Sequence, residues 1–238
     1  MKPVVQQLIG KLIISCQAYE DTPLYGPENM AIMAKSAVLG GADGIRACWP
    51  QDIRAIKDAV DVPVIGIYKE TGNGDPLDHV IITPTLERAK EVVEAGADIL
   101  ALDCTIRESR PFEALEALLR AIRDAYPDIP IMADLATIEE AERAASTGMV
   151  DIISTTLSGY TRNTLGQASE KPDVDFVRAV KERVSLPVNA EGRVWELADL
   201  DAVMAAGADM VTIGTAVTRP HLITARFKRE HDRMLEAQ

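Results

Sequence analysis

The sequence is poor in the residues that cross-link chains or bind metals. It has three cysteines in 238 residues, an odd number without paired spacing. This usage argues against a disulfide framework and predicts small buried cysteines in a reducing, cytoplasmic setting. Its three histidines stand at no expected strand end and have no ligand spacing with cysteine. The sequence therefore predicts neither a histidine base nor a metal site.

Long apolar runs and positive charge are also scarce. No run approaches the roughly 18 residues of a membrane span, and no signal-peptide pattern opens the chain. With 25 basic and 37 acidic residues, the net charge is −12. Nucleic-acid binding requires a positive surface, so neither nucleic acid nor membrane is the expected partner. An anionic small molecule would need local basic groups or backbone amides.

What the chain does contain is a repeat of short apolar runs of two alternating kinds. One kind follows a branched residue and proline, and the other follows a small turn that ends in aspartate. The first are Val62-Pro63, Ile129-Pro130 and Leu186-Pro187; the second are Gly41-Ala42-Asp43, Gly96-Ala97-Asp98, Gly148 to Asp151 and Gly207-Ala208-Asp209. We interpret this as four double units of strand-helix-strand-helix.

Eight strand-helix units predict the α/β class, with parallel strands whose helices cover the sheet. The expected strands are Leu12 to Cys16, Gly44 to Ala47, Val64 to Tyr68, Ile99 to Asp103, Ile131 to Asp134, Ile152 to Thr155, Val188 to Ala190 and Met210 to Ile213. We predict one domain over residues 1–238, a (β/α)8 TIM barrel. A doubly wound open sheet is the alternative, but no Gly-x-Gly-x-x-Gly fingerprint follows the first strand.

Local signals mark where the helices begin and end. Proline at the first helical position predicts starts at Pro27, Pro50, Pro84 and Pro111. The spacing from Thr137 to Glu140 predicts a capping box. Glycines are expected just past four helices, at Gly40, Gly96, Gly148 and Gly207. The terminal helix carries Ile223, Phe227 and Met234, which could cover the barrel or a partner subunit.

Charged residues stand where the strands should end, on the face that carries the chemistry of such barrels. They are Arg46, Lys69, Asp103, Asp134 and Glu191, and Gln17 follows the first strand. Charge is costly in a core unless it is paired. Lys69 could be a base, a Schiff-base amine or an ion-pair partner. Glu191 could orient a substrate, transfer a proton or pair with Lys69 or Arg193.

The last two strand ends suggest an anion site. Small residues follow both strands, in Glu191-Gly192-Arg193 and Gly214-Thr215-Ala216. Barrels often bind phosphate here through loop amides and a short helix, although glycine is also ordinary at such turns. Arg193 and Arg219 could supply charge or lie on the surface. Two long connections, Glu70 to Ile82 and Leu157 to Lys171, suit lids over this face.

Short motifs in order along the chain also resemble a known family. They are Ser15-Cys16-Gln17-Ala18, Gly44-Ile45-Arg46-Ala47, Ile65-Gly66-Ile67-Tyr68-Lys69, Ile82-Thr83-Pro84, Ala101-Leu102-Asp103, Ser154-Thr155-Thr156-Leu157-Ser158-Gly159-Tyr160-Thr161, Ala190-Glu191-Gly192-Arg193 and Gly214-Thr215-Ala216-Val217-Thr218-Arg219. Together they are similar to N-acetylmannosamine-6-phosphate 2-epimerases of bacterial sialic acid catabolism. The resemblance covers roughly residues 12–227.

The resemblance implies an isomerase that interconverts N-acetyl-D-mannosamine 6-phosphate and N-acetyl-D-glucosamine 6-phosphate without a cofactor, as a homodimer. By matching positions, Lys69 and Glu191 are the implied catalytic residues. Substrate-binding positions match Gln17, Arg46, Asp134 and Arg219, and phosphate-binding segments contain Gly192, Arg193, Gly214 and Thr215. Glu70 and Cys48-Trp49-Pro50 depart from the expected pattern. A phosphosugar isomerase or carbon-carbon lyase, and a non-catalytic phosphosugar sensor, are the alternatives.

Overall fold

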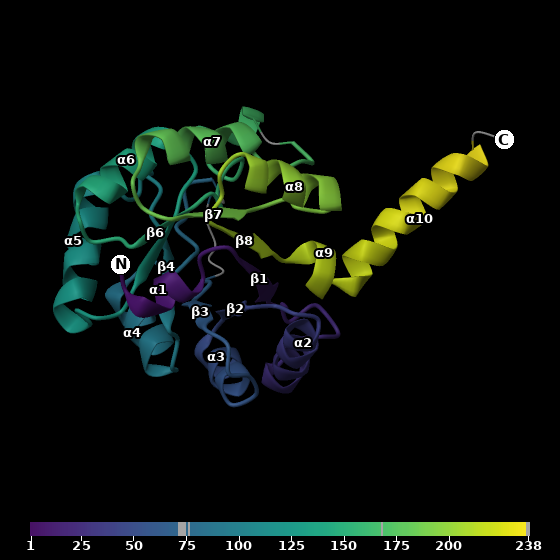
Figure 1. Ribbon diagram of the computed structural model, residues 1–238, viewed down its shortest axis with the longest axis horizontal. Coiled ribbons are helices and arrows are strands. Elements are labelled where there is room, and N and C mark those ends of the chain that lie inside the picture. The colour runs from purple at the N-terminus through teal and green to yellow at the C-terminus, as the bar shows by residue number, and fades with distance from the viewer. Residues whose placement is uncertain (71–74, 76, 168, 237–238) are drawn as a thin grey trace.

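Eight parallel strands close into a barrel, in the order β1 to β8 around it (Figure 1). The computed structural model describes residues 1–70, 75, 77–167 and 169–236. The strands are β1 (Lys11–Cys16), β2 (Gly44–Cys48), β3 (Val64–Ile67), β4 (Ile99–Asp103), β5 (Ile131–Asp134), β6 (Ile152–Ser154), β7 (Val188–Glu191) and β8 (Met210–Ile213). Pairing of Ile13 in β1 with Thr212 in β8 closes the barrel, which excludes the open sheet. Every expected strand is present, with ends displaced by at most one residue.

Helices follow the strands, and most of them cover the outside of the barrel. They are α2 (Pro27–Leu39), α3 (Pro50–Lys57), α4 (Leu86–Glu94), α5 (Phe112–Ala125), α6 (Ile138–Ser146), α7 (Val174–Arg183), α8 (Leu197–Ala205), α9 (Thr215–Thr218) and α10 (Pro220–Glu236), with α1 (Pro3–Gln7) before β1 and a 3-10 turn, η1 (Leu165–Gln167). The starts predicted at Pro27 and Pro50 and the capping box at Thr137 are confirmed.

Two predicted helix starts are wrong by one or two residues. Pro111 is the residue before α5 and not its first residue. Pro84 lies further out, because Thr85 is the N-cap of α4 and its side chain accepts a hydrogen bond from the Arg88 amide. A side-chain cap fixes the start of a helix more directly than a nearby proline does.

The aspartates of the repeated turns join neighbouring strands at the amino-terminal end of the barrel. In each turn the carboxylate accepts a hydrogen bond from the first residues of the preceding strand, and a basic side chain pairs with it. The four amide-to-carboxylate bonds are Leu12 to Asp43, Val64 to Asp98, Ile131 to Asp151 and Val188 to Asp209. The paired cations are Lys11, Lys57, Arg123 and Lys181. The repeated aspartates therefore stabilise the barrel at the amino-terminal ends of its strands, opposite the end where the catalytic residues are expected.

Apolar side chains fill the barrel from inside and outside. Ile65, Ile99 and Met132 belong to an inner cluster, and buried Val5 of α1 and Leu8, which follows α1, join it near the amino-terminal end. A larger cluster lies between the strands and the helices. All three cysteines are free and buried, as expected, and burial raises the pKa of the Cys16 and Cys48 thiols to about 12.

Asp52 in α3 is buried, and neither carboxylate oxygen has a hydrogen-bond partner among the described residues. Burial raises the pKa of Asp52 from 3.8 to about 6. Since the folded chain holds this proton more tightly than the unfolded chain does, ionisation of Asp52 costs stability increasingly between about pH 4 and pH 6. We predict that Asp52→Asn raises the free energy of unfolding by about 1–3 kcal/mol at neutral pH.

Denaturant titrations across this pH range check the prediction. The gain should vanish below about pH 4, where Asp52 is protonated in both states. Asp58→Asn, at an exposed position that caps the same helix, is the matched control. A gain of equal size at acid and neutral pH would show that burial of the charge is not its cause.

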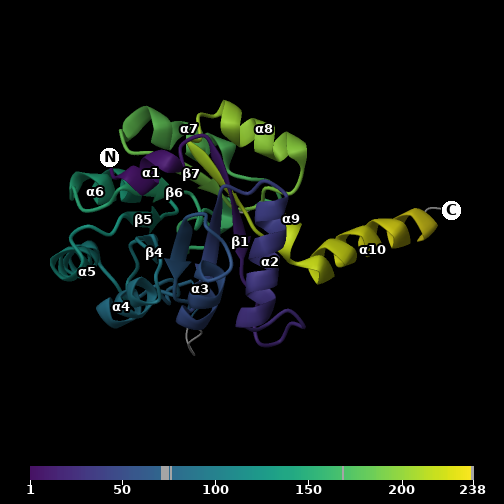
Figure 2. The ribbon, with the colours of Figure 1, turned by 60° about the horizontal axis from the view of Figure 1, so that its bottom comes forward.

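The last helix does not cover the barrel. α10 has no buried residue. It emerges from the barrel between α2 and α8 and projects away from it (Figures 1 and 2). Phe227 on α10 is 71% exposed. The sequence left two possibilities for this helix, packing on its own barrel or on a partner subunit. The first of these is therefore wrong. Among the described residues, no helix combines the length and apolarity needed to cross a membrane.

Candidate active site

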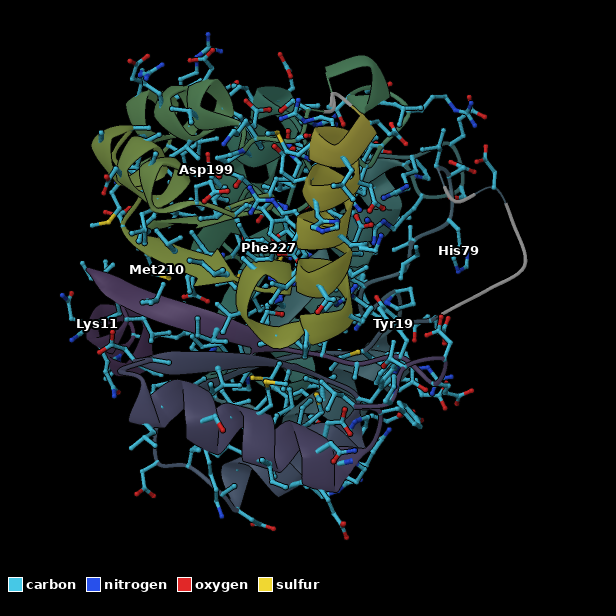
Figure 3. The ribbon with its side chains drawn as sticks, turned by 90° about the vertical axis from the view of Figure 1, so that its right-hand side faces the viewer. Lys11, Tyr19, His79, Asp199, Met210 and Phe227 are labelled. Atoms are coloured by element: carbon cyan, nitrogen blue, oxygen red, sulfur yellow. The ribbon has the colours of Figure 1, made fainter. Side chains whose placement is uncertain are left out.

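A cavity of about 610 Å³ opens at the carboxyl ends of the strands. Figure 3 shows the direction: Lys11 at the start of β1 lies at one end of the barrel, and Tyr19 beyond the strand lies at the other. Eight predicted site residues line the cavity, namely Gln17, Lys69, Glu191, Gly192, Arg193, Gly214, Thr215 and Arg219. Arg46 and Asp134 are almost fully buried and do not line it, although Arg46 contacts Glu191.

Arg46 joins two carboxylates from different strands. Its guanidinium binds both Asp134 oxygens, with Nη1 3.0 Å from Oδ1 and Nη2 2.5 Å from Oδ2. Nη1 also lies 2.5 Å from Glu191 Oε2. Thr156 Oγ1 completes the cluster, 2.7 Å from Asp134 Oδ1 and 3.2 Å from Glu191 Oε2. Arginine presents a planar fork to carboxylates, so this arrangement fixes the orientation of Glu191 toward the cavity.

The surroundings of Glu191 act on the pKa of its carboxyl in opposing directions. Burial raises the pKa of its carboxyl above the ordinary value. The positive charge of Arg46 opposes this effect, the negative charge of Asp134 adds to it, and Lys69 opposes it. A raised pKa lets a glutamate exchange a proton nearer neutrality, which is the property of a general acid or base.

Contacts to neighbouring segments fix both the backbone and the side chain of Lys69. Lys69 forms an antiparallel bridge with Ile82, which draws together the two ends of the connection after β3. The side chain is half-buried, and its Nζ lies 2.9 Å from the Tyr19 hydroxyl. Trp49 Nε1 donates to the Lys69 carbonyl at 3.0 Å. These contacts place the amine at the cavity wall.

The predicted anion-binding segments lie on one side of the cavity. Gly192 and Arg193 follow β7 with φ values of 119° and 59°, in the left-handed region. The Arg193 guanidinium binds the carbonyls of Ser158 and Lys171, so this side chain holds the connection after β6. Gly214 precedes α9, and the first amides of a helix have no partner within it.

Asp103 and Asp134, two acids at the strand ends, are each paired with arginine. Asp103 lines the cavity and accepts hydrogen bonds from Arg107 and Arg110 at 3.0 and 2.8 Å. Asp134 is held by Arg46. In the part of the chain that the structure describes, no group of three histidine, cysteine or acidic side chains is arranged to hold a metal ion.

Both long connections contribute to the cavity. Leu77 and Ile81 come from the predicted lid after β3, and Tyr160 and Leu165 from the one after β6. An ion pair between Asp75 and Arg162 joins them. Residues 71–74 and 76 of the first connection, and residue 168 of the second, lie outside the described residues. Lid movement stays a prediction.

Sequence reasoning missed two residues of the site. Thr156 belongs to one of the short motifs, and its hydroxyl contacts two carboxylates, which the motif does not indicate. Tyr19 lies two residues after Gln17 and contacts Lys69. Its position just beyond the end of a strand, on the face that gathers the charged residues, was the available signal.

A closed barrel with an amine and a fixed carboxylate in one cavity at its carboxyl ends defines a (β/α)8-barrel enzyme. Residues 30–233 match the family described as "Putative N-acetylmannosamine-6-phosphate epimerase". The chain belongs to this family.

Relatives match nearly the whole chain. The "Putative N-acetylmannosamine-6-phosphate 2-epimerase" of Caldanaerobacter subterraneus subsp. tengcongensis is 44% identical over 94% of this chain and 92% of its own. The protein of the same name from Enterobacter sp. (strain 638) is 44% identical over 95% of both chains. The solved structure of the N-acetylmannosamine-6-phosphate 2-epimerase from Clostridium perfringens is 34% identical, with a TM-score of 0.85 over 94% of this chain and 95% of that one.

Proposed function

We propose that this protein interconverts N-acetyl-D-mannosamine 6-phosphate and N-acetyl-D-glucosamine 6-phosphate by exchanging the proton at C2. The observation that carries the proposal is the presence of Lys69 and Glu191 in one cavity of a chain that belongs to the epimerase family. Inversion beside a masked aldehyde requires an opened ring, a base for the C2 proton and stabilisation of the enolate oxygen.

We assign the proton transfer at C2 to Lys69. Its neutral amine takes the C2 proton, and the electrons of the broken C–H bond move into the C1–C2 bond and onto the aldehyde oxygen. A proton returned to the opposite face of C2, by Lys69 itself, by Glu191 or by a substrate hydroxyl, then gives the epimer as the electrons move back from the oxygen and restore the aldehyde. Glu191 assists ring opening or orients the sugar, a role that its raised pKa supports.

We assign the remaining predicted residues to substrate binding. Gln17 lines the cavity with a buried side-chain oxygen that has no hydrogen-bond partner among the described residues, so it can accept from a sugar hydroxyl. Arg46 and Asp134 act on the sugar through Glu191. Backbone amides at Gly192, Arg193, Gly214 and Thr215 would bind the phosphate, with positive charge from Arg219. We assign all of residues 1–238 to one catalytic domain.

Incubation of the protein with the mannosamine phosphate in heavy water, followed by proton NMR, tests the function. We expect a new glucosamine-phosphate signal with deuterium at C2. A ketose product, or a requirement for added metal, would instead support an isomerase or lyase. Unchanged substrate would support a phosphosugar sensor and contradict catalysis.

We further propose that the protein is a homodimer of the cytoplasm, in which α10 of one protomer packs on the other. Ile223, Phe227 and Met234 share one face of α10, because positions i, i+4 and i+11 fall within a narrow arc. Phe227 and Met234 are 71% and 50% exposed. Ile32 on α2 and Leu197 on α8 are also exposed. In Figure 1, α10 leaves the barrel between these two helices. A second copy would cover these apolar surfaces.

Size-exclusion chromatography with light scattering tests the dimer. We predict a mass twice the 25.8 kDa of the chain for the wild type, and a monomer for Phe227→Asp. Arg229→Asp places the same charge on the other side of α10 and should leave the dimer intact. A wild-type protein that is monomeric at working concentration would contradict the proposal.

A further inference from the structure

Tyr19 connects the amine at the proton-transfer end of the cavity with the cation at the phosphate end. Its hydroxyl lies 2.9 Å from Lys69 Nζ, and the Arg219 guanidinium carbon lies 5.1 Å from the centre of its ring. Tyr19 lines the same cavity as both residues. One aromatic side chain therefore sets the spacing between the two groups that the proposed reaction needs.

The Tyr19 ring is itself held by neighbouring aromatic side chains. It packs edge-on against Trp49, with centroids 5.9 Å apart and planes at 82°. Trp49 packs in the same manner against Tyr25, at 6.3 Å. Trp49 also donates to the Lys69 carbonyl, so the cluster contacts Lys69 at its backbone and at its amine. Edge-to-face contacts and a partly buried indole hydrogen bond favour one arrangement of these rings.

We propose that Tyr19 is a positioning residue that aims the Lys69 amine at C2 and stabilises its protonated form. The phenol oxygen accepts one N–H of Lys69, which leaves the lone pair of the neutral amine free to face the substrate. Once Lys69 has taken the C2 proton, the same contact becomes a hydrogen bond from an ammonium ion, and it strengthens. An interaction that is stronger in the transition state than in the ground state raises kcat and leaves KM nearly unchanged.

This inference rests on the proposed epimerase function, and Tyr19→Phe tests it. The substitution removes the hydroxyl and keeps the ring against Trp49 and Arg219. Loss of a hydrogen bond to a charged group should lower kcat about tenfold or more. KM should change by less than about twofold, and C2 deuterium incorporation should fall with kcat. Tyr25→Phe removes a hydroxyl from the same cluster, where its partner is exposed Glu20, and should behave as the wild type.

An ultraviolet titration of tyrosinate provides a readout independent of turnover. Burial alone would raise the pKa of Tyr19, but the charge and hydrogen bond of Lys69, with the charge of Arg219, lower it below its usual value. The difference between wild type and Tyr19→Phe isolates this tyrosine. In Lys69→Met we expect it to ionise at higher pH.

The outcomes separate the two proposals. A wild-type protein that does not epimerise the sugar phosphate overturns the proposed function. An active wild type with kcat equal in Tyr19→Phe and Tyr25→Phe overturns the role of Tyr19 alone. A Tyr19→Phe variant with a raised KM and an unchanged kcat also overturns this role, because the hydroxyl would then bind substrate. The role is overturned as well if Tyr19 ionises at the same pH in Lys69→Met as in the wild type.

Discussion

Replacement of Lys69 by alanine should abolish both epimerisation and exchange of the C2 proton. A positioned general base contributes roughly 10²- to 10⁴-fold to a rate, and the loss should lie in this range. Lys69 is half-buried at the cavity wall, and its backbone contacts to Ile82 and Trp49 do not depend on the amine. We therefore expect thermal unfolding of the variant to stay close to that of the wild type. The measurement is proton NMR in heavy water with the mannosamine phosphate.

Lys57→Ala is the matched control for this experiment. Lys57 is also half-buried, but it pairs with Asp98 at the amino-terminal end of the barrel. Its loss should lower stability slightly and leave deuterium incorporation unchanged. If Lys69→Ala still incorporated deuterium at the wild-type rate, another group would be the base and the assignment of Lys69 would be rejected.

The barrel could be predicted from the sequence because its repeat has a physical cause. Each Gly-Ala-Asp or related turn ends a helix and supplies a carboxylate to the strand before it, as Asp98 does for Val64. The same requirement arises at each repeated turn, so the same residue types recur at regular intervals in the sequence. The charged residues at the strand ends, such as Lys69, interrupt apolar runs and were visible for that reason.

Other parts of the site depend on distances between segments far apart in the chain. The sequence indicates that Arg46, Asp134 and Glu191 follow three strands, but it does not state how deep each side chain lies. The structure buries Arg46 and Asp134 behind Glu191, because pairing makes burial of these charges tolerable. The position of Tyr19 after a strand places it on the face of the charged residues, but only the structure shows that its hydroxyl contacts Lys69. The apolar face of α10 was visible, but its direction away from the barrel was not.

Replacement of Arg46 by methionine should have the largest effect on stability. Arg46 is 1% exposed and neutralises two carboxylates, so its removal leaves Asp134 and Glu191 close together without a cation. Removing one partner of a buried pair typically costs about 3–5 kcal/mol. We expect a loss of this size in the free energy of unfolding, measured by denaturant titration. Activity should fall as well, because Glu191 loses its orientation.

The pH dependence of this loss identifies its cause. Without Arg46, burial and the nearby charge of Asp134 should raise the pKa of the Glu191 carboxyl further above its value in the unfolded chain. Stability is then lost as pH rises through this range and is regained as pH falls and Glu191 takes up a proton. The destabilisation should therefore shrink toward acid pH. Arg120→Met, which removes an exposed pair with Glu116 on α5, should change stability by less than about 0.5 kcal/mol.

A second substitution separates the cost of unpaired charge from the cost of lost packing in Arg46→Met. If the cost of Arg46→Met comes from the unpaired carboxylates, then Arg46→Met combined with Asp134→Leu should unfold at higher denaturant than Arg46→Met alone. Equal or lower stability of the double variant would mean that lost packing around Arg46 dominates. Since both variants lack the Arg46 contact that orients Glu191, the activity of the double variant should stay as low as that of Arg46→Met. The cluster would then stabilise the fold through neutralised charge and support catalysis through the position it gives Glu191, two effects that this pair of measurements resolves.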